Sequence, residues 1–210
     1  MTDYLTIARD GQSEIEVKRS RFLATVTRVE EEAAARAVVE RLRREHWNAR
    51  HHCSAFVLGP SAQVQRSSDD GEPAGTAGAP MLEVLRGREV SDVVAVVTRW
   101  FGGVLLGAGG LVRAYGDAVR ATLDEVGLQR RRLLTEWVVE LGHAEAARAE
   151  SELRARGVVV VDASYSATVT LRLGVAPDDV DRLHGLVAEL SGGRALAVAA
   201  GERWVDSGRA

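Results

Sequence analysis

Three carboxylates lie close together near the middle of the chain: Asp69, Asp70 and Glu72. A run of small residues, Ala74 to Ala79, follows them and opens a helix that we expect to continue through Arg88. Grouped carboxylates can supply a general base or hold a magnesium ion. The Asp-Gly dipeptide is also a common turn signal, so the same residues can simply build a rigid turn. Both interpretations fit the sequence.

A second bend, Gly102 to Gly110, joins the apolar strand Val93 to Trp100 to a helix that runs to about Val126. Glycine suits a backbone with positive φ or a close approach to another group. The free N–H groups at the start of the following helix suit an anion. We therefore expect the two bends to face a shared groove, which is the candidate binding site.

Arg99 emerges at the end of the apolar strand, where burial should stop. It either faces a ligand or pairs with one of the three carboxylates across the groove. A carboxylate cluster needs positive charge nearby, which favours the pairing. Arg113, on the helix after the second bend, is similarly either a ligand contact or a surface partner of Asp117.

Adjacent residues of a strand point to opposite faces, so His51 and His52 are poorly placed to share one metal ion. We expect one histidine to line the groove and the other to be buried and hydrogen-bonded. The basic residues near Lys18 and Arg21 form either a basic lip on the site or a charged strand edge that resists aggregation. The full set of candidate binding residues is Asp69, Asp70, Glu72, Thr76, Arg99, Arg113, His51, Lys18 and Arg21.

No sequence motif identifies a catalytic reaction. The chain has no P-loop lysine motif, no nucleophile elbow and no zinc-spaced histidine pair, so we predict no catalytic residue, no metal and no cofactor. A small-molecule phosphate-handling enzyme and an RNA-binding protein stay open as alternatives. The net charge of -3 and the aromatic content of 5% speak against RNA. Because all but one of the 27 basic residues are arginine, arginine counts are weak evidence for a phosphate site.

The remaining pattern predicts an α+β chain of two domains, 1–127 and 128–210. We expect residues 1–13 to be an exposed lead-in and residues 129–132 to be a charged hinge. The elements expected in the first domain are a strand pair over 14–28, a helix over 30–46 and a strand over 53–58. Those expected in the second are strands over 135–141, 158–161, 167–173 and 194–205 with helices over 143–156 and 178–190, in the order βαββαβ.

The totals describe an ordinary soluble protein of 210 residues, with 46% hydrophobic and 27% charged residues. A single cysteine, Cys53, excludes an internal disulfide and fits a reducing cytoplasm; we expect it to be a buried strand residue. The N-terminus lacks a signal-peptide pattern, and no apolar run approaches the roughly 18 residues of a membrane span. We therefore expect a cytoplasmic protein with no membrane contact.

Several long strings resemble the IMPACT/YigZ family: DDGEPAGTAG, VVTRWFGG and LGAGGLVRAYG, preceded by KRSRF and ARHHC. The resemblance covers roughly residues 15–126, and the rest of the chain fits the second domain of bacterial members. It implies a first domain like domain 2 of ribosomal protein S5, a ferredoxin-like second domain and no established reaction. It also implies a regulatory or binding role in translation, with a protein partner in that machinery. Trp100 departs from the tyrosine expected there, which keeps the aromatic plane and removes the hydroxyl.

Overall fold

A computed structural model of the chain describes residues 2–209. The chain divides into two compact units, one of residues Asp3–Arg131 with the C-terminal segment from Ser207, the other chiefly of Arg132–Asp206. The sequence predicts the division after residue 127, ahead of a charged hinge. In the structure residues 129–132 belong instead to a continuous strand, β7 (Leu128–Leu141), and the division falls within it. None of the helices within 2–209 is long and apolar enough to cross a membrane.

The first unit contains an antiparallel five-stranded sheet in the order β2-β3-β6-β4-β5. Its strands are β2 (Gly11–Val17), β3 (Ser20–Arg28), β4 (His51–Leu58), β5 (Val64–Ser68) and β6 (Val93–Trp100). The strand pair expected over 14–28 is the β2–β3 hairpin, which turns at Lys18 and Arg19. The central strand β6 has the predicted bounds.

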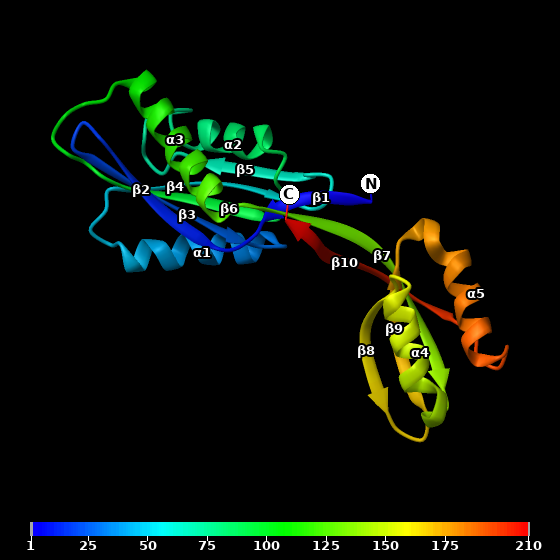
Figure 1. Cartoon of the computed structure of the whole chain (residues 1–210). Helices are drawn as coiled ribbons and strands as arrows, with labels where there is room; N and C mark the ends of the chain where they lie inside the picture. Colours follow the sequence, from blue (N-terminus) through cyan, green and yellow to red (C-terminus); the bar gives the residue numbers. More distant parts are fainter. Residues whose placement is uncertain (1, 210) are drawn as a thin grey trace. The chain divides into compact units, whose positions relative to one another are not determined.

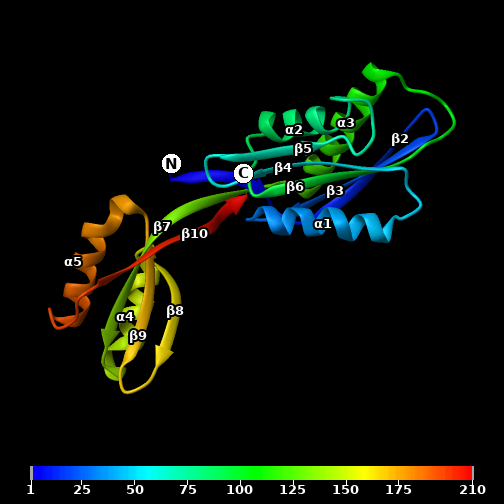
Figure 2. The same ribbon diagram turned by 180° about the vertical axis from the view of Figure 1, so that it is seen from behind.

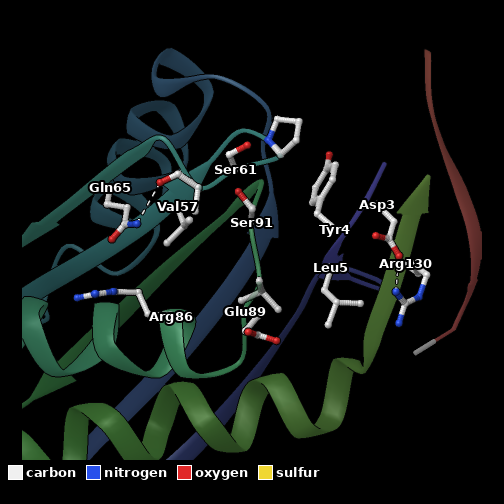
Figure 3. A pocket seen from close by; sticks show the side chains of 13 residues that line it. Asp3, Tyr4, Leu5, Val57, Ser61, Gln65, Arg86, Glu89, Ser91 and Arg130 are labelled. Atoms are coloured by element: carbon white, nitrogen blue, oxygen red, sulfur yellow. Dashed lines mark hydrogen bonds and ion pairs between the residues drawn. The ribbon is translucent and has the colours of Figure 1, made fainter. Parts of the chain in front are cut away.

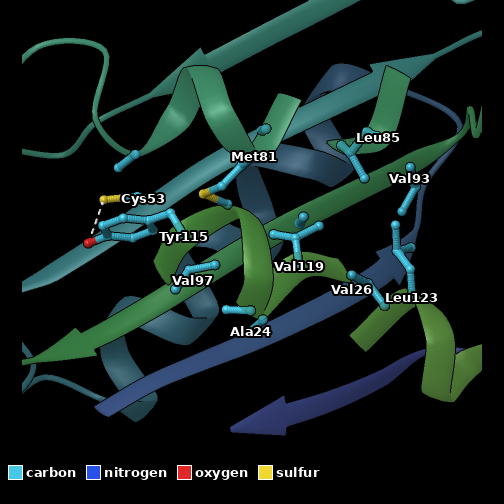
Figure 4. Packing of buried hydrophobic residues seen from close by; sticks show 14 of the residues in the cluster. Ala24, Val26, Cys53, Met81, Leu85, Val93, Val97, Tyr115, Val119 and Leu123 are labelled. Carbon is cyan, nitrogen blue, oxygen red and sulfur yellow. Dashed lines mark hydrogen bonds between the residues drawn. The ribbon is translucent and has the colours of Figure 1, made fainter. Parts of the chain in front are cut away.

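Helices cover both faces of this sheet. Helix α1 (Glu32–Glu45) lies on one face, and α2 (Gly78–Gly87) and α3 (Ala108–Val126) lie on the other (Figures 1 and 2). Alternate residues of β6 are therefore buried on opposite sides: Val97 packs toward α2 and α3, and Val96 packs toward α1. Figure 4 shows the larger of these two cores, where side chains of α2 and α3 meet those of β3, β4 and β6. The prediction that β6 is covered on both sides is confirmed.

One expectation for the first unit was wrong, and another needs a shifted boundary. Residues 1–13 were expected to be an exposed lead-in, but strand β1 (Asp3–Ile7) buries Ile7 completely and β2 begins at Gly11; residue 1 lies outside the described residues. The expected helix after the carboxylates is present as α2, but it begins at Gly78, near the end of the small-residue run, because Ala74 to Ala77 form turns. The edge strand β5 was not predicted, because its polar sequence, VQRSS, shows no apolar pattern.

The second unit has the predicted order of strands and helices. Strand β7 is followed by α4 (His143–Ala155), β8 (Val159–Tyr165), β9 (Val169–Val175), a 3₁₀ turn (Pro177–Asp179), α5 (Val180–Ser191) and β10 (Val198–Arg209). Strand β9 pairs antiparallel with β7 and β8, and β10 pairs with β7. Gly192 ends α5 in the left-handed conformation, at φ 60°, as its type predicts.

Candidate functional site

The first bend is organised by Asp69. Its Oδ1 accepts hydrogen bonds from the backbone N–H groups of Ala77 at 3.0 Å and Gly78 at 2.8 Å, and its Oδ2 accepts one from Gly75 at 2.8 Å. Burial by itself raises the pKa of the Asp69 carboxyl, but these three donors outweigh burial and hold the pKa below its usual value. Asp69 is therefore a structural anchor, which was one of the two interpretations of the carboxylates.

Asp70 connects the first bend to β4 and α1. One of its carboxylate oxygens accepts from the Arg43 guanidinium at 2.7 Å and the other from the His52 backbone N–H at 2.6 Å. Its own carbonyl accepts a hydrogen bond from His51 Nδ1 at 2.8 Å. Because a carbonyl can only accept, the His51 proton sits on Nδ1 and leaves Nε2 free to face Glu72 Oε1, 3.9 Å away.

Glu72 is the centre of a buried polar network. Its Oε1 accepts from Arg99 Nη1 at 2.5 Å and from the Tyr115 hydroxyl at 2.7 Å, and the Glu72 and Arg99 side chains are only 4% and 7% exposed. Cys53 Sγ donates to the Tyr115 hydroxyl at 3.3 Å. Of the two alternatives for Arg99, the structure contains the ion pair, and its carboxylate partner is Glu72.

The two neutral groups of this network, the Cys53 thiol and the Tyr115 hydroxyl, both have raised pKa values. Burial is the main reason that the Cys53 pKa rises to about 12, although the hydrogen bond to Tyr115 partly opposes the rise. Burial, followed by the interactions with Cys53 and Glu72, also raises the pKa of the Tyr115 hydroxyl far above its usual value. The expectation that Cys53 is a buried strand residue is confirmed, since it lies on β4 with no exposed surface. Neither group is a nucleophile at neutral pH.

The second bend rests on the tip of the β2–β3 hairpin. The Gly102 N–H donates to Ser20 Oγ at 3.2 Å, and a Cβ at Gly102 would lie only 2.0 Å from the carbonyl carbon and oxygen of Arg19. Only glycine allows this approach. Gly103 and Gly107 then adopt φ values of 83° and 74°, and α3 begins directly after Gly107.

The two bends line one cavity of about 450 Å³. Gly71, Glu72 and Pro73 contribute the first bend, and Leu105 to Ala108 contribute the second. Arg99 lines the same cavity from β6, His51 lines it from the first position of β4, and Arg50 lines it from the residue before β4. This volume lies within the usual range of small-molecule sites, about 300 to 1,000 Å³.

The predicted site residues fall into three groups. His51, Glu72 and Arg99 line the cavity, whereas Asp69, Asp70 and Thr76 shape the bend beside it. Thr76 bonds to the Pro73 carbonyl through both its hydroxyl, at 2.7 Å, and its N–H, at 3.0 Å.

The other three predicted residues lie outside the cavity lining. Lys18 is exposed at the hairpin turn. Arg21 is held by Glu14 at 2.7 Å and its guanidinium carbon lies 4.7 Å from the centre of the Trp100 ring. Arg113 is exposed on α3 and lines a different hollow, together with Pro80 and Arg120. The alternative Arg113–Asp117 pair is absent from residues 2–209, where Asp117 pairs with Arg120 instead.

Sequence reasoning missed the polar role of Tyr115, the cavity position of Arg50, and the contact of Ser20 with Arg99 Nη2 at 3.4 Å. A hydroxyl on the buried stripe of a helix needs a partner, and that signal pointed to a buried acceptor. Of the histidines, His51 lines the cavity and His52 is buried at 4% exposure, as expected. The expected hydrogen bonding of His52 is incomplete, because its Nε2 has no partner within residues 2–209.

A further cavity, of about 480 Å³, lies at the other end of β6 (Figure 3). Tyr4, Ser91 and Arg130 are among the residues that surround it. Its polar side chains are engaged with the protein itself: Ser91 Oγ donates to the Gly59 carbonyl at 2.5 Å, and Arg130 pairs with Asp3. Across the described chain, no group of three or more His, Cys, Asp or Glu residues is arranged to hold a metal ion.

The fold is that of an α+β protein of two compact units, with a cavity in the first unit. Comparison with known proteins identifies its family. Residues 18–123 match the Impact N-terminal domain, and residues 139–194 match a domain of unknown function, DUF1949. The chain is 39% identical over 191 residues to the IMPACT family member YvyE of Bacillus subtilis, covering 91% of this chain and 88% of that protein. It is 41% identical over 180 residues to the IMPACT family member YigZ of Escherichia coli, covering 85% and 88%.

A solved structure agrees with these matches. The crystal structure of a hypothetical protein, 39% identical in sequence, aligns with a TM-score of 0.66 over 95% of this chain and 98% of that chain. The chain therefore belongs to the IMPACT family, close to its bacterial members YigZ and YvyE. The family resemblance predicted from DDGEPAGTAG and the two later strings is confirmed.

Proposed function

We propose that this protein is a non-catalytic binding protein that regulates translation, and that it contacts a protein of the translation machinery through the cavity between its two bends. One observation carries the proposal. The bends around Glu72 and Gly107 line one cavity. The buried Arg99–Glu72 ion pair lines the same cavity and joins the first bend to β6.

The chemistry of the network supports binding rather than catalysis. Glu72 Oε1 already accepts hydrogen bonds from Arg99 and Tyr115, so this oxygen is engaged with the protein itself. The Cys53 thiol, with its pKa near 12, is not a nucleophile at neutral pH. The rim offers apolar contact surface instead, because Leu105 is 82% exposed and Phe101 is 42% exposed.

The assignment to translation rests on the IMPACT resemblance and on the fold that it implies. The helix-covered antiparallel sheet of the first unit supports an architecture like domain 2 of ribosomal protein S5. The strand pairing β10-β7-β9-β8 and the βαββαβ order support a ferredoxin-like second unit. Both architectures are part of the proposal.

The test is co-sedimentation of the full chain with ribosomes and translation factors from a lysate, with and without nuclease. Association that survives nuclease and is reduced by Leu105→Ser or Arg50→Glu supports a protein contact at the cavity. Both residues line the cavity and are exposed, so the fold should tolerate these changes. Arg113→Glu is the matched control, because Arg113 is exposed but lies outside the cavity lining. Association that is insensitive to all three variants would overturn the proposal.

RNA binding is a second candidate, favoured by the hairpin beside the cavity. Lys18 and Arg19 are exposed at its tip, and Arg21 stacks on Trp100 near them. A basic tip next to an aromatic plane suits a single-stranded backbone and base. RNA binding predicts that the affinity for RNA falls steeply as the salt concentration rises. A slope near zero in a plot of log affinity against log salt concentration would exclude RNA binding.

A further inference from the structure

The N-terminus of helix α3 opens into the cavity. The helix is 19 residues long and begins at Ala108, and its N-cap residue, Gly107, provides no side-chain hydrogen bond. Gly107 and Ala108 both line the cavity. The first N–H groups of a helix lack intrahelical acceptors and carry partial positive charge. This end of α3 therefore presents donors to whatever occupies the cavity.

Arg99 supplies an independent observation on the same cavity. The residue is 94% buried, since only 6% of its surface is exposed, yet its Nε has no hydrogen-bond partner within residues 2–209. Its Nη2 has a single long contact, 3.4 Å to Ser20 Oγ. A buried guanidinium has five N–H donors to satisfy, and leaving them without acceptors is costly. Among the described residues only Glu72 and Ser20 accept hydrogen bonds from this guanidinium, so a ligand acceptor in the cavity, which Arg99 lines, would satisfy a further donor.

Arg50 adds a charge that the protein does not neutralise. It is exposed at the cavity and makes no ion pair with any residue between 2 and 209. The one carboxylate in the cavity lining, Glu72, is already matched by Arg99. Arg50 and the end of α3 therefore leave the cavity net positive.

The rest of the lining is apolar. Phe101, Leu105, Leu106 and Leu111 form one side of the cavity, next to the start of α3. A ligand that fills the cavity therefore needs an anionic group at the helix end and an apolar group against these side chains. Donors that arrive from α3, from Arg50 and from Arg99 suit a tetrahedral anion with three free oxygens better than a planar carboxylate with two.

We propose that this cavity binds a phosphate monoester whose phosphate is carried on a small aromatic or apolar group. The proposal rests on the function proposed above, since it names the chemistry that the same cavity recognises. The phosphate sits at the start of α3, between Arg50 and the buried Arg99, and the apolar group packs against Phe101 and Leu105.

The binding experiment uses phenyl phosphate as the probe, titrated into the full chain by calorimetry or by following amide chemical shifts. Inorganic phosphate, phenol and benzoate are titrated alongside it. We expect phenyl phosphate to bind at least about tenfold more tightly than either phosphate or phenol alone, because it uses both parts of the cavity. Benzoate binding as tight as that of phenyl phosphate would assign the cavity to carboxylates and overturn the proposal. Absence of phenyl phosphate binding would also overturn it.

Two matched pairs of variants place the phosphate. Ala108→Asp puts a negative charge at the first residue of α3, where it favours the helix but repels an anion, so binding should be lost without loss of folding. Ala108→Asn has nearly the same shape as Ala108→Asp without the charge, so it should weaken binding by clearly less than Ala108→Asp does. Arg50→Ala should weaken binding about tenfold or more, whereas Arg113→Ala should not change it. Equal effects within either pair would place the probe elsewhere and overturn the assignment.

This inference and the proposed function fail in different ways. If phenyl phosphate does not bind but Leu105→Ser still reduces nuclease-resistant association with the translation machinery, the ligand class is wrong and the function stands. If phenyl phosphate binds as described but no association is found, the cavity is a phosphate site and the function is wrong.

Discussion

Glu72 and Arg99 form an ion pair, with 2.5 Å between Oε1 and Nη1, although they are 27 residues apart in the chain. The pair joins the first bend to the end of the central strand of the sheet. Tyr115, from the helix after the second bend, donates to the same Glu72 oxygen. This one oxygen therefore links three segments around the cavity.

The contributions of Glu72 and Arg99 to the free energy of unfolding should depend strongly on each other. Glu72→Gln and Arg99→Met should each lower the free energy of unfolding by about 3 to 5 kcal/mol, because each leaves the other charge buried without its partner. The double variant should cost clearly less than the sum of the two single variants. Urea unfolding of the four proteins measures this cycle. Additive effects would mean that the two side chains do not depend on each other.

Cys53 should make stability fall in mild alkali. Its folded-state pKa is about 12, and an unfolded cysteine ionises near about 8.5, so the unfolded state releases its proton first as the pH rises. Stability should then decrease above about pH 8.5, approaching about 1.4 kcal/mol per pH unit. Cys53→Ala should remove this decrease between about pH 8.5 and 10, before tyrosines titrate.

The measurement is unfolding by urea across that pH range for both proteins. Because Cys53→Ala also removes packing, the comparison concerns the pH slope and not the absolute stability. The native thiol should also resist a thiol reagent at neutral pH, since the residue has no exposed surface. Parallel slopes for the two proteins would contradict the burial of this thiol.

Asp69→Asn should destabilise the first bend by about 1 to 3 kcal/mol at pH 7, because a charged acceptor of three backbone N–H groups becomes a neutral amide. The folded-state pKa of Asp69 is lowered, so its contribution is present above the unfolded value of about 3.9 and is lost as the pH falls through the folded value. The difference from the native protein should therefore shrink in acid.

The matched control for this prediction is Asp117→Asn. Asp117 carries the same charge but is 60% exposed and pairs only with Arg120 on the surface of α3. Its replacement should change stability by less than about 0.5 kcal/mol. Thermal unfolding at a series of pH values compares the two variants. Similar losses in both would mean that Asp69 does not organise the bend.

Gly102→Ala should displace the second bend, because its Cβ would lie 2.0 Å from the backbone of Arg19. Gly109→Ala is the control, since nothing lies within 4 Å of a Cβ there and alanine favours a helix over glycine by about 1 kcal/mol. We expect Gly102→Ala to lower the melting temperature and change the amide shifts of Lys18 to Ser20. Gly109→Ala should keep or raise the melting temperature. A harmless Gly102→Ala would contradict the contact between bend and hairpin.

Local patterns in the sequence determined most of the elements and the family. Val93 to Val97 is continuously apolar, which predicts a strand covered on both faces, and Pro177 and Gly192 mark the ends of a helix by their backbone preferences. The two glycine-rich bends and their order were also sufficient for the IMPACT resemblance. These features depend on neighbours in the chain, so the sequence carries them directly.

The tertiary structure alone decided which polar groups meet. Three carboxylates within four residues look alike in sequence, but Asp69 binds its own loop, Asp70 binds Arg43 and β4, and only Glu72 reaches the cavity. Arg113 was predicted as a site residue but lines a different hollow, because of its position on α3. Arg50 was not predicted, yet it lines the cavity from the residue before β4. A side chain's partner across the fold depends on strand register and helix rotation, which are set by the packing of the whole domain.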